Sequence, residues 1–179
     1  MLMSRDESLL LLIDLQERLL PHIDDWQRVL DNSIWLLQIA QKLGVPVLAS
    51  EQYPKGLGHT HADLAALLAP QNIVTKEHFS CVAAGCVPAA GVDRAQIVVA
   101  GVESHVCVLQ TVLELISPER QVFVVEDAVG SREPRSKQFA LERMRAYGAE
   151  IVTREMVAFE WLRRAGTNEF RAISKEFLR

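Results

Sequence analysis

Cysteine is scarce in this sequence, and no two cysteines form a close pair. Cys81, Cys86 and Cys107 are the three cysteines among 179 residues, an odd number without Cys-x-x-Cys spacing. Such a set supports neither a disulfide framework nor a zinc ribbon. We therefore expect free thiols in a reducing compartment.

The chain also lacks an excess of positive charge. Its 19 Lys and Arg residues stand against 23 Asp and Glu residues, which gives a formal net charge of −4. No cluster of basic residues is interleaved with aromatic residues, as a surface that binds phosphate backbones would require. A nucleic-acid partner is therefore not expected.

Long apolar runs are missing as well. The run nearest the amino terminus, residues 8–13, follows Asp6 and Glu7 and ends at Asp14. It is too short to span a membrane, and it lacks the basic start and the cleavage site of a signal peptide. We expect a cytoplasmic protein without a membrane partner.

Short apolar runs that alternate with helix-like segments are the main positive signal. The runs expected to form strands are residues 8–13, 45–50, 72–75, 95–101, 121–127 and 149–153. Helical spacing of apolar residues predicts helices over 24–44, 62–69, 106–116 and 136–148. Strands that are apolar throughout need cover on both faces, as in a parallel sheet with helices on each side. We expect a three-layer α/β fold, and one domain over residues 1–179 because no linker or repeat divides the chain.

Three polar residues follow predicted strands and form a chemically coherent set. Asp14, Lys76 and Cys107 each stand at a strand end, where open α/β sheets place their ligand crevice. A cysteine in the first turn of a helix, near an ammonium group, is expected to have a lowered thiol pKa. Asp14 could take the thiol proton and pass it to a leaving amine. The alternative readings are a cysteine buried as a small apolar residue, an aspartate that caps a turn and a solvated lysine.

The segments around these residues resemble a known family. Asp14 within "LLIDLQ", Lys76 within "VTKEHFSC" and Cys107 within "VAGVESHVCV" look like the motifs of the isochorismatase-like cysteine hydrolases, a group that includes nicotinamidase and N-carbamoylsarcosine amidase. The resemblance covers nearly the whole chain. It is strongest to the branch called isochorismatase domain-containing proteins, through "SEQYPKGLG", "KEHFSC", "GVESHVCVLQT" and "EDAVGSREPRSKQFAL".

The resemblance implies a Rossmann-like sheet and a role for each residue of the set. Cys107 would be the nucleophile, Asp14 the general acid and base, and Lys76 the cation that holds the pair charged. The family also has a cis peptide bond before the cysteine, which maps onto Val102–Glu103. The backbone N–H groups of Glu103 and Cys107 would then form an oxyanion hole.

Two departures from the family pattern concern a metal site and the pocket. Nicotinamidases carry an Asp-x-His metal motif, and the matching residues here are Glu51 and Tyr53, so the imidazole ligand is missing. His59 and His61 have no acidic partner at a fixed spacing and are interpreted as loop residues. Leu19 stands where the metal-dependent amidases tend to have a pocket aromatic. We expect no metal and no cofactor.

The remaining candidates concern the substrate pocket. The residues expected to bind substrate are of apolar or aromatic type: Leu19, Tyr53, Phe79 and Val106. His78 and His105 either line the pocket or make structural hydrogen bonds. Cys81 and Cys86 are interpreted as packing residues.

The expected function is a metal-independent cysteine hydrolase that cleaves a C–N bond of a small amide-like substrate through a thioester. Cys107 argues against the vinyl-ether cleavage of isochorismatase itself, which uses no cysteine nucleophile. The physiological substrate is not predicted. The alternative is a redox-responsive or small-molecule-binding protein on the same fold, whose thiol is oxidised rather than acylated.

The carboxyl-terminal tail, residues 156–179, is rich in large apolar residues. They fall in two short predicted helices parted at Gly166: Met156, Val157, Phe159, Trp161, Leu162, Phe170, Ile173, Phe177 and Leu178. They either cover the edge of the sheet or meet another subunit. Because the resembling family forms oligomers, we expect a homo-oligomer with this tail in or near the interface.

Overall fold

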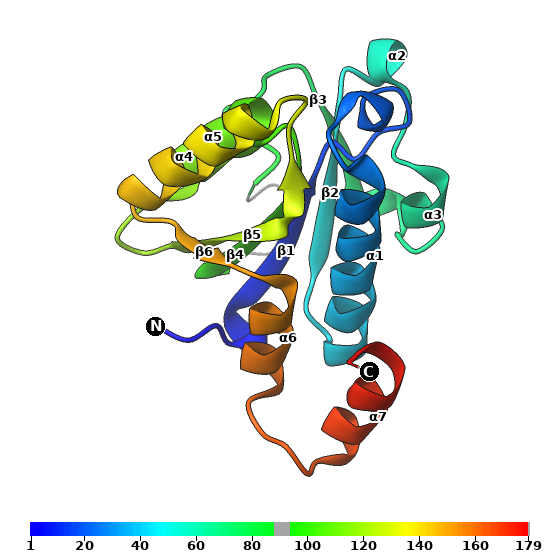
Figure 1. Cartoon of the computed structure of the whole chain (residues 1–179), viewed down its shortest axis with the longest axis vertical. Coiled ribbons are helices and arrows are strands. Elements are labelled where there is room, and N and C mark those ends of the chain that lie inside the picture. The colour runs from blue at the N-terminus through cyan, green and yellow to red at the C-terminus, as the bar shows by residue number, and fades with distance from the viewer. Residues whose placement is uncertain (88–93, 179) are drawn as a thin grey trace.

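A six-stranded parallel sheet forms the centre of the molecule (Figure 1). The computed structural model describes residues 1–87 and 94–178. The strand order is β3-β2-β1-β4-β5-β6, and every pair of neighbours is parallel. The strands are β1 (Ser8–Ile13), β2 (Val47–Gln52), β3 (Ile73–Lys76), β4 (Gln96–Val102), β5 (Gln121–Gly130) and β6 (Glu150–Val152). The predicted α/β class with a parallel sheet is confirmed.

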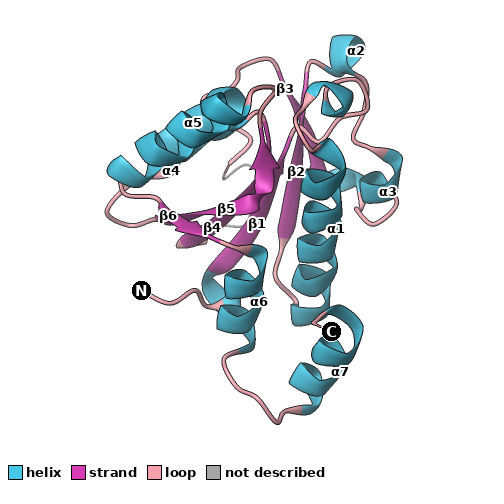
Figure 2. Ribbon diagram, viewed as in Figure 1, coloured by secondary structure: helices cyan, strands magenta, loops and turns pink. Residues whose placement is uncertain are grey.

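Helices cover both faces of this sheet (Figure 2). They are α1 (Trp26–Leu43), α2 (Pro54–Leu57), α3 (Ala62–Ala65), α4 (Leu109–Leu115), α5 (Pro134–Ala146), α6 (Arg154–Leu162) and α7 (Asn168–Phe177). α1 and α6 lie on one face, and α4 and α5 lie on the other, which gives three layers. Within the described residues, no helix is both long and apolar enough to cross a membrane.

Two apolar cores result from the alternation of side chains along each strand. In β1, Leu10 and Leu12 belong to the core under α1 and α6, whereas Leu9 and Leu11 belong to the core under α4 and α5. Every residue of β1 is buried. The unbroken apolar run that predicted this strand is therefore explained by cover on both faces.

The order of the strands reverses between β1 and β4, and this switch point locates the candidate site. The chain passes from β1 to β2 on one side of the sheet and reaches β4 on the other side of β1. Gly101 of β4 lies beside Ile13 of β1, with a φ of 121°. A Cβ atom at Gly101 would lie 2.1 Å from the Ile13 carbonyl oxygen, so only glycine permits this close approach.

Of the nine large apolar residues in the tail, four are buried and three are half-buried against the chain itself. Ile173 of α7 is 1% exposed, and the Phe177 ring packs edge-on against Trp35 of α1. The Trp35 indole N–H also donates to the Phe177 carbonyl oxygen (3.1 Å). Met156 and Phe159 remain exposed. The apolar surplus that suggested an interface in the tail is thus smaller than the sequence indicated.

Element boundaries differ from the sequence prediction in a few places. The helix expected over 62–69 ends at Ala65, and β5 continues past residue 127 to Gly130. The helix expected from residue 106 begins only at Leu109, as α4. The residues before it form a π-helical turn, Ser104–Val108, that contains Cys107. Residues 88–93, between β3 and β4, and Arg179 at the end of the tail lie outside the described residues.

Candidate active site

Asp14 lies directly after β1 and is completely buried. Its φ of 53° turns the chain sharply away from the strand, in a region that aspartate tolerates better than most residues. Ser50 of β2 donates a hydrogen bond from its hydroxyl group to Asp14 Oδ1 (2.7 Å). Lys76 donates to Asp14 Oδ2 (2.8 Å), so both carboxylate oxygens have partners.

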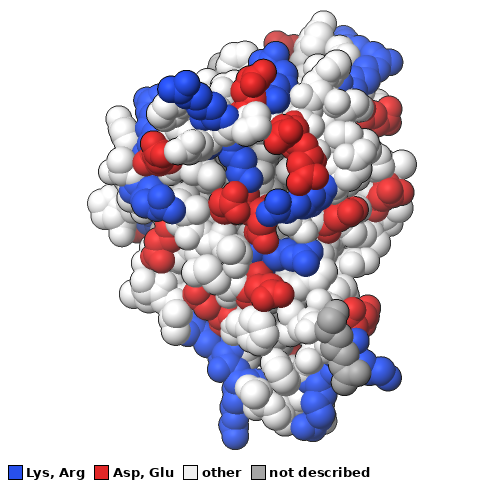
Figure 3. Space-filling view, viewed as in Figure 1, with Lys and Arg blue, Asp and Glu red and all other residues white. Residues whose placement is uncertain are grey.

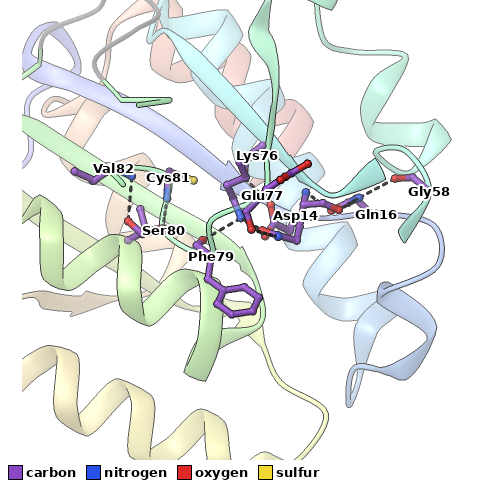
Figure 4. A network of polar contacts seen from close by, with 12 residues as sticks. Asp14, Gln16, Gly58, Lys76, Glu77, Phe79, Ser80, Cys81 and Val82 are labelled. Atoms are coloured by element: carbon purple, nitrogen blue, oxygen red, sulfur yellow. Dashed lines mark hydrogen bonds and ion pairs between the residues drawn. The ribbon is translucent and has the colours of Figure 1, made fainter. Parts of the chain in front are cut away.

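Lys76 ends β3, and its ammonium group reaches the end of β1 (Figure 4). Nζ donates to Asp14 Oδ2 at 2.8 Å, to Gln52 Oε1 at 2.6 Å and to the Phe79 carbonyl oxygen at 3.0 Å. An ammonium group has three protons, and these contacts use all three. Gln52 is held in turn, because its Nε2 donates to the Glu77 carbonyl oxygen (2.8 Å). The lysine is therefore fixed beside Asp14 as a cation.

Cys107 lies in the π-helical turn between β4 and α4. The residue is 5% exposed, and its thiol lies near enough to the Asp14 carboxylate for each group to shift the pKa of the other. Since β4 is the neighbour of β1, the turn that follows β4 reaches the end of β1. Asp14, Lys76 and Cys107, separated by up to 93 positions in the sequence, meet at one point.

Burial raises the pKa of the Cys107 thiol above its ordinary value, and the adjacent Asp14 charge raises it further, while Lys76 lowers it. The expected lowering of this pKa is therefore wrong for the resting site. Burial also raises the pKa of Asp14, opposed by Lys76. Burial alone would lower the pKa of Lys76, but the negative charge of Asp14 reverses this and raises it. The raised pKa means that the thiol keeps its proton in the resting site.

The peptide bond between Val102 and Glu103 is cis, at the position to which the family resemblance maps one. The Glu103 carboxylate accepts hydrogen bonds from the backbone N–H (3.2 Å) and from Nε (3.0 Å) of Arg132. The Glu103 carbonyl oxygen accepts from the N–H groups of Val106 and Val108. These contacts hold both ends of Glu103 at the start of the turn that carries Cys107.

Two buried side chains around the site were not identified from the sequence. Ser50 and Gln52 bind Asp14 and Lys76, as described above, and polar residues inside an otherwise apolar strand were the available signal. Cys81 lies nearby, and its backbone N–H donates to the Thr111 hydroxyl oxygen (3.0 Å). Burial raises the pKa of Cys81 to about 11. Cys81 packs in the same core as Cys86, as expected for a packing residue, but it also adjoins the polar cluster.

Glu51 and the two histidines that follow it have protein partners: Glu51 binds Thr60 and His59, and His61 binds Asp63. Glu51 Oε1 accepts from the N–H (2.7 Å) and the hydroxyl group (2.8 Å) of Thr60, and Oε2 lies 3.1 Å from His59 Nδ1. His61 Nδ1 accepts from the Asp63 N–H at the start of α3. No group of three or more His, Cys, Asp or Glu residues suited to a metal occurs in the described part of the chain. This donor set does not fit the metal motif of nicotinamidases.

The contacts of Glu51 predict a pH-dependent contribution to stability. Burial alone would raise the pKa of Glu51, but its hydrogen bonds from Thr60 and His59 lower it below the ordinary value of 4.5. The ionised form therefore stabilises the folded protein above that value, and this stability is lost as the pH falls through the lowered pKa. We expect Glu51→Gln to lower the free energy of unfolding by about 1–3 kcal/mol at pH 7. Urea unfolding should show that the difference in the free energy of unfolding between the parent protein and Glu51→Gln shrinks below pH 4.5.

The matched control for Glu51 is Asp63→Asn, because the Asp63 side chain is 73% exposed in the same region. The free energy of unfolding of Asp63→Asn should stay within about 0.5 kcal/mol of that of the parent protein, both at pH 7 and below pH 4.5. A gap for Glu51→Gln that does not change with pH would contradict the assignment.

The four residues expected to bind substrate do not share one environment. Tyr53 and Phe79 are each 51% exposed, and the Phe79 ring is turned away from Lys76 (Figure 4). Val106 packs against the core that contains Cys107, whereas Leu19 packs against the core on the other face of the sheet. Three of the four adjoin the polar cluster: the Phe79 carbonyl oxygen accepts from Lys76, the Tyr53 N–H donates to the Lys76 carbonyl oxygen (2.9 Å), and Val106 directly precedes Cys107.

The two histidines that flank the motifs differ in their contacts. His105 Nδ1 lies 3.0 Å from the Ser131 hydroxyl oxygen, at hydrogen-bond distance. His78 is exposed. A structural hydrogen bond therefore accounts for His105.

Comparisons with known proteins show which family and which fold this chain shares. A family model described as the isochorismatase domain matches residues 8–156. Isochorismatase domain-containing protein 2A of Mus musculus is 37% identical over 173 residues, which cover 95% of this chain and 82% of that protein. A solved structure described as the MAR1 ribonuclease of Caenorhabditis elegans has a TM-score of 0.91 and 32% identity, over 100% of this chain and 93% of that one. The YcaC gene product of Escherichia coli, described as an octameric hydrolase of unknown specificity, has a TM-score of 0.83 and 25% identity, over 91% and 83% of the two chains.

Proposed function

We propose that this chain, which belongs to the isochorismatase family, hydrolyses a C–N bond in a small amide-like substrate through a thioester on Cys107. The observation that carries the proposal is the buried cluster in which the Cys107 thiol adjoins the Asp14 carboxylate and Asp14 is paired with Lys76. A nucleophile, a base within hydrogen-bond reach and a group that orients the base are the three parts that nucleophilic catalysis requires.

The first step is attack by sulfur on the substrate carbonyl carbon. The Cys107 proton passes to Asp14 as the C–S bond forms, so no free thiolate has to exist beforehand. The raised pKa values of Cys107 and Asp14 fit this coupling, because the thiol keeps its proton until attack and burial makes Asp14 a better acceptor than an exposed aspartate. Lys76 limits the cost of the buried negative charge.

The second step concerns the charge on the substrate oxygen. The backbone N–H groups of Glu103 and Cys107 donate to this oxygen in the tetrahedral intermediate. When the intermediate collapses, the C–N bond breaks and Asp14 returns its proton to the leaving nitrogen. A water molecule, deprotonated by Asp14, then hydrolyses the thioester, which releases the acid and restores the Cys107 thiol.

The redox-responsive alternative requires a thiolate that is exposed to oxidants. Cys107 is 5% exposed and its thiol pKa is raised, which favours the hydrolase. A redox sensor would also have no use for Asp14 as a proton carrier. An RNA substrate, as the description of the Caenorhabditis elegans structure would suggest, is disfavoured by the net charge of −4 and by the burial of the cluster. On the face drawn in Figure 3, acidic side chains lie among the basic ones.

The proposed setting is a metal-independent enzyme in the cytoplasm that assembles as a homo-oligomer. The octameric description of the Escherichia coli structure supports assembly. We propose that Tyr53, Phe79 and Val106 line the pocket, and that Leu19, which packs against the core under α1 and α6, bounds it from that side of the sheet.

Mass spectrometry of the intact protein separates the two functions. Incubation with an activated amide or ester should produce one acyl adduct that maps to Cys107 and disappears on further incubation in water. Mild peroxide should leave Cys107 largely unmodified over the same period. Reversible sulfenate or glutathione adducts without any acyl adduct would favour the redox alternative. A panel of amides, ureas and carbamates, screened for turnover, would then define the substrate class.

A further inference from the structure

The outward face of α5 carries a stripe of alternating cations and aromatic rings. Its members are Arg135, Phe139, Arg143 and the C-cap residue Tyr147, spaced four residues apart, so each adjoins the next in a row that winds slowly along the helix. Phe139 is 55% and Tyr147 58% exposed, and both arginines are exposed. Large exposed aromatic residues in a row are uncommon on a surface that only meets water.

Each arginine of the stripe covers the next aromatic ring. The guanidinium carbon of Arg135 lies 5.3 Å from the centre of the Phe139 ring, and that of Arg143 lies 5.9 Å from the centre of the Tyr147 ring. An aromatic ring has two faces that can accept a cation, and its own neighbour covers one of them. The stripe therefore offers further cation–π sites to an incoming surface.

The stripe is complementary to itself when two copies run in opposite directions. We propose that α5 packs antiparallel against α5 of a second copy of this chain, around a two-fold axis between Phe139 and Arg143. Arg135 then faces Tyr147 of the second copy, and Phe139 faces its Arg143. The same two contacts recur on the other side of the axis, as a two-fold interface requires.

A second copy fits this stripe better than an unrelated partner would. Any other partner would need the same alternation of cations and rings over about 18 Å of helix, whereas a second copy supplies it by symmetry. Arginine and aromatic residues are also the types enriched at the centres of protein interfaces. The exposed apolar residues of α6 form no such self-complementary series. This inference does not depend on the proposed catalytic activity, but it rests on the proposed assembly as a homo-oligomer.

Two substitutions at one position test the pairing by light scattering of the full chain at micromolar concentration. Phe139→Arg places a cation opposite Arg143 of the second copy, and we expect the mass to fall at least twofold from an even multiple of 20.0 kDa. Phe139→Glu places an anion opposite the same arginine and should keep the parent mass. A patch held together by apolar contact alone would dissociate in both variants.

The matched control is Phe159→Arg on α6, because Phe159 is 48% exposed and lies outside the stripe. We expect this variant to keep the parent mass. A parent protein of 20.0 kDa, an unchanged mass for Phe139→Arg, or dissociation of Phe139→Glu would each overturn the pairing. Loss of assembly in Phe159→Arg with retention in Phe139→Arg would also overturn it, and would place the interface in the tail. Circular dichroism melts verify that each variant is folded.

Discussion

Replacing Cys107 by serine is expected to lower kcat/KM by more than about 10⁴-fold on any amide that the protein turns over. A serine hydroxyl is a much weaker acid than a thiol, and the pKa of the thiol is already raised by burial and by Asp14. Transfer of a hydroxyl proton to Asp14 would therefore be far less favourable. Initial rates at several substrate concentrations, compared with those of the parent protein, measure the loss.

Cys86→Ser is the matched control for this variant. Cys86 is also a buried cysteine, and burial raises the pKa of its thiol too, but no hydrogen bond joins it to Asp14 in the described residues. We expect kcat/KM to change by less than about threefold, with a small loss of stability from a buried hydroxyl group. Equal activity losses in both variants would show that core disruption, rather than loss of the nucleophile, explains the effect.

Much of the fold follows from local sequence patterns. The strand over residues 8–13 was predicted to the residue, because six apolar or small residues bounded by acidic residues leave little freedom for its ends. The two tail helices parted at Gly166 were also predicted. The rule that ligands bind beyond the carboxyl ends of parallel strands then brought Asp14, Lys76 and Cys107 together as candidates. The order of the strands, which makes β4 the neighbour of β1, is a tertiary property that local patterns do not encode.

The electrostatics of the site could not be derived in the same way. The sequence predicted a lowered thiol pKa from a helix terminus and a nearby lysine, and both are local arguments. The structure adds the burial of Cys107 and the charge of Asp14, and these two effects outweigh Lys76. Ser50 and Gln52 were missed for a related reason, because their importance lies in which atoms of Asp14 and Lys76 they face.

The second large effect is expected on stability, from Lys76→Met. Both Lys76 and Asp14 have side chains without solvent exposure, so removing the cation leaves a buried carboxylate without its counter-charge. The oxygens of Gln52 and Phe79 that accept from Lys76 would also lose their donor. Removing one member of a buried ion pair costs about 3–5 kcal/mol, and we expect that loss in the free energy of unfolding at pH 7. Urea titration monitored by tryptophan fluorescence measures it.

The cost of Lys76→Met depends on the charge of Asp14, and this gives the prediction its sharpest test. Burial raises the pKa of Asp14 above 3.8, and without Lys76 it rises further, so the folded variant takes up a proton on Asp14 more readily than the unfolded chain does. The stability gap from the parent protein should therefore narrow as the pH falls through that raised pKa. Adding Asp14→Asn removes the charge at every pH and should recover most of the loss, because a neutral buried pair avoids the uncompensated charge. If the double variant were as unstable as Lys76→Met alone, lost packing would be the cause.

Lys76 also lowers the pKa of the Cys107 thiol. Alkylation of that thiol by iodoacetamide should therefore require a higher pH in Lys76→Met than in the parent protein. Lost packing alone would not produce this change.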